Sequence, residues 1–144
     1  MVTTTHDQME TIELAQKLAK KLVGGKVLAL HGDLGGGKTT FTKGLAEALK
    51  VEEIITSPTF VMLKNYPAKL SDGKKIELVH IDAYRAETID DIKSVGIEDF
   101  LNRDDVVMVV EWAEKISEIL PKNMININFK FIDENTRAIE IEDK

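Results

Sequence analysis

One short segment has the residue types and spacing of a phosphate-binding loop. Residues 32–39 read GDLGGGKT, which fits the pattern Gly-x-x-x-x-Gly-Lys-Thr. In such a loop successive backbone N–H groups converge on phosphate oxygens, and glycines leave room for their close approach. The pattern predicts that Lys38 bridges the β- and γ-phosphates and that the Thr39 hydroxyl ligates Mg²⁺. The residues expected to bind ATP or ADP here are Gly35, Gly36, Gly37, Lys38, Thr39 and Thr40.

The segments on either side of these glycines favour the same interpretation. Residues 27–30 form an apolar run of strand length, and Phe41, Leu45, Ala48 and Leu49 recur at helical spacing. A helix that begins near Lys38 adds its positive N-terminal dipole to an anion site. The alternative is a glycine-rich turn that only reverses the chain, but the strand–loop–helix context favours a nucleoside triphosphate.

Two apolar segments end in carboxylates. Residues 76–81 lead into Asp82, and residues 106–110 lead into Glu111. Because ligands gather at the carboxyl ends of parallel strands, both acids are expected to face the phosphate loop. The alternative is a pair of solvated acids at strand ends. We expect Glu111 to hold the metal and Asp82 to activate water, although the sequence also allows the exchanged roles.

Two further candidates also have a structural interpretation, which for Trp112 is the favoured one before any resemblance is considered. Thr59, in Ser57-Pro58-Thr59-Phe60, is placed to sense Mg²⁺ or the γ-phosphate as a switch residue, or lies in a simple turn that leads into a strand. Trp112 is the only tryptophan and either packs in the core or stacks on a base or a partner. His31 and His80 lie in strand-like runs without metal-ligand spacing, so we interpret both as structural.

The elements that must position these residues alternate between helix and strand. Apolar periodicity predicts a helix over 10–23, a strand over 27–30, a helix from about 38 and short helical structure over 88–101. Segments 56–66 and 76–81 are expected to pair as a hairpin, 106–110 to form a buried central strand, and 124–132 and 137–141 to form a closing hairpin. The fold class predicted is α/β: a P-loop NTPase-like layered fold with a mainly parallel central sheet and a C-terminal β-hairpin, in a single domain over 1–144.

Composition limits the classes of function. The 144 residues carry a formal net charge of −6, so strong independent binding to nucleic acid is not expected. The chain has no cysteine, which excludes disulfides and thiolate chemistry. Neither a signal peptide nor a membrane-spanning run is recognisable, so no contact with a membrane is expected and the cytoplasm is the expected compartment.

Four motifs in order, GDLGGGKTTFTKGL, SPTF, HIDAYR and VEW, resemble the bacterial TsaE family over about residues 7–137. The resemblance implies an ATPase that supports threonylcarbamoyl modification of the tRNA adenosine next to the anticodon. Its partners would be the proteins TsaB and TsaD, which ATP hydrolysis would reset, and tRNA would be reached only indirectly. Motif matching implies phosphate and Mg²⁺ roles for Lys38 and Thr39, a second metal role for Glu111 and a catalytic role for Asp82.

The resemblance also bears on the remaining candidates. It implies a switch-like role for Thr59 and a functional role for Trp112. It implies that the segment around Gln8 and Thr11, and Arg137 in the closing hairpin, line the nucleotide site. Gly36 stands where family members more often have alanine, which gives a looser loop that still binds nucleotide.

Two other classes share part of this pattern. A small-molecule kinase would need a lid of arginines over the phosphates, whereas Arg85, Arg103 and Arg137 are scattered along the chain. A guanine-nucleotide switch acting as a binding module would need an Asn-Lys-x-Asp motif, which the sequence lacks. Competition between ATP and GTP would separate this second class from an ATPase.

Overall fold

A seven-stranded sheet organises the part of the chain that the structure describes. The computed structural model describes residues 1–32, 37–56, 58 and 61–143. Its strands lie in the order β1-β7-β6-β2-β5-β4-β3, so neighbours in the sheet are often distant in the sequence. The strands are β1 (Val2–Thr5), β2 (Val27–Gly32), β3 (Leu63–Lys69), β4 (Lys75–Asp82), β5 (Val106–Glu111), β6 (Ile125–Phe131) and β7 (Arg137–Asp143).

The centre of the sheet is parallel and its two margins are antiparallel. Strands β6, β2, β5 and β4 run parallel to one another. On one side β3 pairs antiparallel with β4, and on the other β7 pairs antiparallel with β6 and with β1. All six residues of β5 are buried, as expected for a central strand covered on both faces. The predicted α/β class, the parallel sheet centre and the C-terminal hairpin are therefore confirmed.

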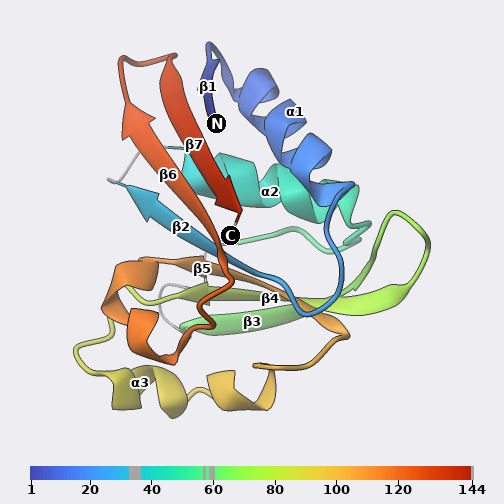
Figure 1. Cartoon of the computed structure of the whole chain (residues 1–144), viewed down its shortest axis with the longest axis vertical. Helices are drawn as coiled ribbons and strands as arrows, with labels where there is room; N and C mark the ends of the chain where they lie inside the picture. The colour runs from blue at the N-terminus through green and yellow to red at the C-terminus, as the bar shows by residue number, and fades with distance from the viewer. Residues whose placement is uncertain (33–36, 57, 59–60, 144) are drawn as a thin grey trace.

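Helices cover both faces of the sheet (Figure 1). On one face lie α1 (Gln8–Ala19) and α2 (Lys38–Ala48), which pack with sheet residues such as Leu28, Leu78 and Val109. On the other face lie α3 (Ile89–Lys93) and three 3₁₀ segments, η1 (Ile97–Asp99), η2 (Ala113–Lys115) and η3 (Ser117–Ile119). The second core forms there around residues such as Val79 and Ile92. The result is a three-layer arrangement.

Alternation along the strands decides which side chains face α2. Successive strand residues point to opposite faces, and in the register of the parallel pair β4–β5 residue Asp82 lies beside Glu111. Leu78 of β4 and Val109 of β5 belong to the core beneath α1 and α2. Asp82 shares its face with Leu78, and Glu111 with Val109, because each lies an even number of residues further along its strand. Both terminal acids therefore lie on the face that carries α2.

A glycine allows α1 and α2 to pack closely. A Cβ added at Gly44 would lie 2.9 Å from the Cα of Ile12, closer than real Cβ atoms approach a backbone. A larger residue at this position would push the two helices apart. Since both helices contribute residues to the same cavity, their separation affects its shape.

The first helix differs from the sequence prediction at both ends. It begins two residues earlier than residue 10 because Asp7 caps it, accepting a hydrogen bond from the Glu10 amide at 2.8 Å. It ends at Ala19 rather than at residue 23. The amides of Lys21 and Leu22 bond three residues back, to Leu18 and Ala19, which tightens the chain into a turn. Leu22 is buried without being helical.

The strand predicted over 56–66 begins only at Leu63. Before it, Met62 has a left-handed backbone with φ of 66°, and its amide donates to the carbonyl of Pro58. That turn delays the strand, which then extends to Lys69 and pairs with β4 as the predicted hairpin. Strand β1 was not predicted, because four residues carry too little pattern to identify an edge strand.

The strand and helix next to the phosphate-loop motif agree with the prediction. Strand β2 covers the predicted residues 27–30 and extends to Gly32, and α2 begins at Lys38. The segment 88–101 forms α3 and η1, as the short helical pattern predicts. Among the helices of the described part of the chain, none has the length and apolar character needed to cross a membrane.

Candidate functional site

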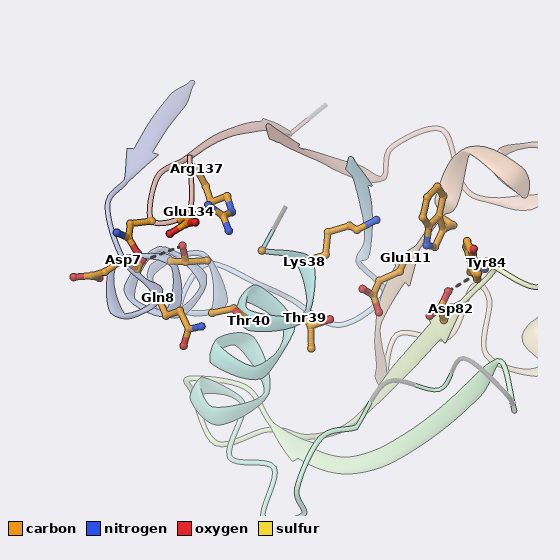
Figure 2. A pocket seen from close by; sticks show the side chains of 14 residues that line it. Asp7, Gln8, Lys38, Thr39, Thr40, Asp82, Tyr84, Glu111, Glu134 and Arg137 are labelled. Carbon is orange, nitrogen blue, oxygen red and sulfur yellow. Dashed lines mark hydrogen bonds between the residues drawn. The ribbon is translucent and has the colours of Figure 1, made fainter. Parts of the chain in front are cut away.

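The described part of the phosphate-loop motif opens into a cavity of about 740 Å³ (Figure 2). Every described residue that the sequence analysis named for the site lines this cavity, although these residues come from five separate parts of the chain. The lining residues are Asp7, Gln8, Thr11, Gly37, Lys38, Thr39, Thr40, Asp82, Tyr84, Glu111, Trp112, Glu134, Asn135 and Arg137. Gly35, Gly36 and Thr59 lie outside the described residues, and their proposed roles stay predictions.

The N-terminus of α2 brings a positive charge to the cavity. Gly37 precedes the helix with a left-handed backbone of φ 100°, a conformation that L side chains rarely adopt. Lys38 follows as the first helical residue and is only 5% exposed. Its Nζ donates a hydrogen bond of 2.7 Å to the carbonyl of Gly32, at the end of β2. The ammonium is thus held at the end of β2, and the dipole of α2 adds positive potential at the same place.

The two strand-end acids face this cation from the sheet. Asp82 and Glu111 are paired neighbours at the ends of β4 and β5, and each is 5% exposed. One oxygen of Asp82 accepts from the Tyr84 amide at 2.9 Å. One oxygen of Glu111 lies 2.8 Å from Nε2 of His80. The structure therefore brings the two predicted acids together at one edge of the cavity.

Trp112 both packs on the core and lines the cavity. It is partly buried against the core on the α3 face, and its ring centroid lies 5.2 Å from that of Tyr84. Lys38 Nζ lies 4.2 Å from the centre of the indole ring, within range of a cation–π contact. A left-handed backbone at Trp112, with φ of 58°, turns the chain directly after Glu111. The two interpretations of this tryptophan are therefore compatible.

The opposite end of the cavity is built by the start of α1 and the turn between β6 and β7. Gln8 and Thr11 lie on the first turns of α1, and the Thr11 hydroxyl bonds that of Thr5 at 2.8 Å. Arg137 begins β7, and its guanidinium donates to the carbonyls of Asp133 and Thr136 in the turn. Figure 2 shows Arg137 at the Asp7 end of the cavity, away from Asp82.

The β6–β7 turn is fixed by a carboxylate. Asp133 accepts hydrogen bonds from the amides of Asn135 at 2.9 Å and Thr136 at 2.8 Å. The amide of Asn135, followed by the contact with Thr136, lowers the pKa of Asp133 below its ordinary value, because both contacts favour the charged form. This turn presents Glu134, Asn135 and Arg137 to the cavity.

The sequence analysis missed four lining residues: Asp7, Tyr84, Glu134 and Asn135. Asp7 carried a signal, since an aspartate before an apolar-periodic run is a typical helix N-cap. Tyr84 lies two residues beyond Asp82, inside one of the motifs already singled out. Glu134 and Asn135 lie between the two strands of the predicted closing hairpin, and nothing local in the sequence indicates that this connection reaches a cavity.

The donors in the cavity fit a magnesium ion held mainly by nucleotide and water. No cluster of three or more histidine, aspartate or glutamate residues suitable for a metal occurs among the described residues. The cavity offers instead the exposed hydroxyl of Thr39 and the carboxylate of Glu111. Mg²⁺ commonly uses one or two protein oxygens together with water and substrate phosphates, so this sparse set is chemically suitable.

The arrangement of strand, glycine-rich motif, helix and strand-end acids defines the class of fold as that of the P-loop NTPases. A crystal structure of Bacillus subtilis YdiB is similar to this chain, with a TM-score of 0.77 and 35% sequence identity, covering 96% of this chain and 82% of that one.

The particular family follows from the sequence. The family described as "Threonylcarbamoyl adenosine biosynthesis protein TsaE" matches residues 5–139. The tRNA threonylcarbamoyladenosine biosynthesis protein TsaE of Bacillus subtilis is 41% identical over 130 residues, 90% of this chain and 77% of that protein. The protein of the same name from Streptomyces coelicolor is 45% identical over 109 residues, 74% of this chain and 70% of that protein. The chain belongs to the TsaE family, which functions in tRNA threonylcarbamoyladenosine biosynthesis.

Proposed function

We propose that this protein is a Mg²⁺-dependent ATPase that supports threonylcarbamoyl modification of the tRNA adenosine next to the anticodon, acting on a TsaB–TsaD complex. One observation carries the proposal: a lysine and a threonine at the start of α2 share a cavity with two buried strand-end acids. A site that only bound phosphate would need the cation and the helix N-terminus, but not two carboxylates beside them.

The cationic side of the cavity binds the phosphates. Lys38 exchanges its bond to the Gly32 carbonyl for the β- and γ-phosphate oxygens, and charge assistance favours this exchange. Thr39 and Thr40 lie on the first turn of α2, where helix amides and hydroxyls meet an anion. Trp112 flanks the ammonium and limits the directions from which water approaches it.

The acidic side of the cavity carries out the hydrolysis of ATP. Thr39 and Glu111 are the residues that would hold Mg²⁺, which when bound neutralises phosphate charge. Asp82 orients the attacking water and accepts its proton. The Tyr84 amide holds one oxygen of Asp82 in place, which fixes the direction of the carboxylate.

The remaining features fit a protein that works through partners. The net charge of −6 disfavours direct attraction to a tRNA backbone, so the tRNA would be bound by the TsaB–TsaD pair. Since the tRNA pool is cytoplasmic, we expect this protein to work in the cytoplasm.

The decisive experiment is steady-state ATP hydrolysis with Mg²⁺, with and without the TsaB–TsaD pair, for the wild-type protein and Lys38→Ala. We expect slow hydrolysis alone, stimulation by the pair and loss of both activities in the variant. Lys43→Ala, which changes an exposed lysine on the same helix, is the matched control and should behave like wild type. Hydrolysis that Lys38→Ala leaves intact would contradict the site. Hydrolysis indifferent to the pair would contradict the proposed partners.

A further inference from the structure

His80 occupies an unusual position for an imidazole. It lies within β4, is 0% exposed and is flanked along the strand by the buried apolar residues Val79 and Ile81. In the parallel register it lies beside Val109 of β5, which is also fully buried. A position of this kind is normally filled by an aliphatic side chain.

The ring makes one hydrogen bond and leaves its other nitrogen without a partner. Nε2 lies 2.8 Å from Oε2 of Glu111, and because a carboxylate accepts, we assign the hydrogen to Nε2. Nδ1 is buried and has no hydrogen-bond partner within the described part of the chain. Most buried polar atoms in proteins are paired, so an exception requires an explanation.

Folding stability alone does not explain this histidine. An aliphatic residue at position 80 would fill the same core without burying an unpaired nitrogen. The single bond that His80 makes goes to a side chain that lines the cavity. What the imidazole adds over an aliphatic side chain is therefore its contact with Glu111.

The geometry explains why Glu111 needs such a contact. The carboxylate of Glu111 lies at the end of a flexible side chain. His80 lies two residues before Asp82 on the same face of β4, and the β4–β5 register brings it within reach of that carboxylate. Asp82 is shorter and is fixed by a backbone amide at Tyr84. The corresponding contact of Glu111 is with a side chain of the neighbouring strand, that of His80.

We propose that His80 is a positioning residue, which binds one oxygen of Glu111 so that the other is presented to Mg²⁺ in the cavity. This inference rests on the proposed function, since it concerns how Glu111 meets a nucleotide-bound cation. Residues that orient metal ligands typically change metal affinity by about 10- to 100-fold when they are replaced.

Three substitutions separate positioning from packing. His80→Gln keeps a side-chain N–H at about the reach of Nε2, His80→Asn keeps an amide that is too short to reach Glu111, and His80→Leu keeps the volume without a donor. Leu78→Ala is the control, because Leu78 is fully buried on the same strand face and is not a lining residue of the cavity.

The measurement is calorimetric binding of a non-hydrolysable ATP analogue in EDTA and in Mg²⁺, so that turnover is not the readout. We expect equal affinity in EDTA for all variants. The gain in affinity due to Mg²⁺ should fall by about tenfold or more in His80→Leu and His80→Asn, and remain near the wild-type gain in His80→Gln and Leu78→Ala.

Each alternative outcome has a definite meaning. An undiminished Mg²⁺ gain in folded His80→Asn or His80→Leu overturns the inference and leaves the proposed ATPase intact. A fall in Leu78→Ala as large as in His80→Asn also overturns it, because packing would then explain the effect. If the wild-type protein shows no nucleotide binding or no Mg²⁺ gain, the proposed function fails, and the inference fails with it.

Discussion

The two ends of the cavity are built in different ways. The end that contains Lys38, Asp82 and Glu111 is formed by the start of one helix and the ends of two central parallel strands, and these three side chains are buried. The other end is formed by the start of α1 and the turn before Arg137, two segments near opposite ends of the chain. The first end lies on the centre of the sheet, whereas the second lies over its antiparallel margin (Figure 1).

From this difference we infer that the two ends of the cavity have different roles. Buried charges that converge on one point suit chemistry, because low dielectric strengthens their action on a reacting group. Partly exposed groups on a cap and a turn suit the binding of the remaining part of a ligand. Substitutions at the first end should therefore change turnover most, and substitutions at the second should change affinity.

Among the substitutions that compare the two ends of the cavity, Asp82→Asn should have the largest effect. The substitution keeps the shape of the side chain but removes the carboxylate that accepts the proton of water, so turnover should fall by about 100- to 10,000-fold. Affinity for ATP should stay within a few-fold, as measured by calorimetry beside steady-state hydrolysis. Asp90→Asn, an exposed acid on α3, is the matched control. Loss of nucleotide binding in Asp82→Asn would show that the acid holds the ligand, and the two acids would then exchange roles.

Arg137→Ala tests the opposite end and should have an intermediate effect. Removing a charged donor from the cavity should weaken ATP binding by about tenfold, the size typical of a charge-assisted hydrogen bond. Turnover at saturating ATP should change by no more than about twofold, since Arg137 lies away from Asp82. Lys130→Ala, an exposed cation on β6, should have no effect. A fall in turnover comparable to that of Asp82→Asn would contradict the division between the two ends.

The smallest effect concerns the pH dependence of the β6–β7 turn. The amide of Asn135 and the contact with Thr136 lower the pKa of Asp133, so the turn is stabilised above the ordinary carboxyl pKa. That contribution is lost as the pH falls through the lowered, folded-state pKa. An NMR titration of the Asp133 carboxyl should show a midpoint below the ordinary value, and Asp133→Asn should abolish the transition. A midpoint at or above the ordinary value would contradict the turn geometry.

Much of the fold could be predicted because its signals are local. The apolar run of β5 and the alternation of β6 and β7 each lie within seven residues, and both were recognised. Errors arose where a local turn interrupts the apolar pattern, or where an element is very short. The predicted first helix extends to residue 23, whereas α1 ends at Ala19. Leu22 continues the apolar spacing of the helix, although the backbone has already turned there. The four-residue β1 exists only because β7 offers it an edge to pair with.

The sequence by itself determined which residues form one end of the site. A glycine-rich motif with lysine and threonine between a strand and a helix, and acids directly after apolar strands, can be recognised over a few residues, and parallel strands bring their carboxyl ends to one edge of the sheet. Those patterns identified Lys38, Thr39, Asp82 and Glu111, all of which line one cavity.

Only the tertiary structure decided what surrounds those residues. The β4–β5 register brings His80 within 2.8 Å of Glu111, although the two residues are 31 positions apart in the chain. Sheet order and helix packing bring the start of α1 next to the β6–β7 turn. The physical reason is that the motif consists of residues that are neighbours in the sequence, whereas these contacts depend on how distant segments bury their apolar faces together.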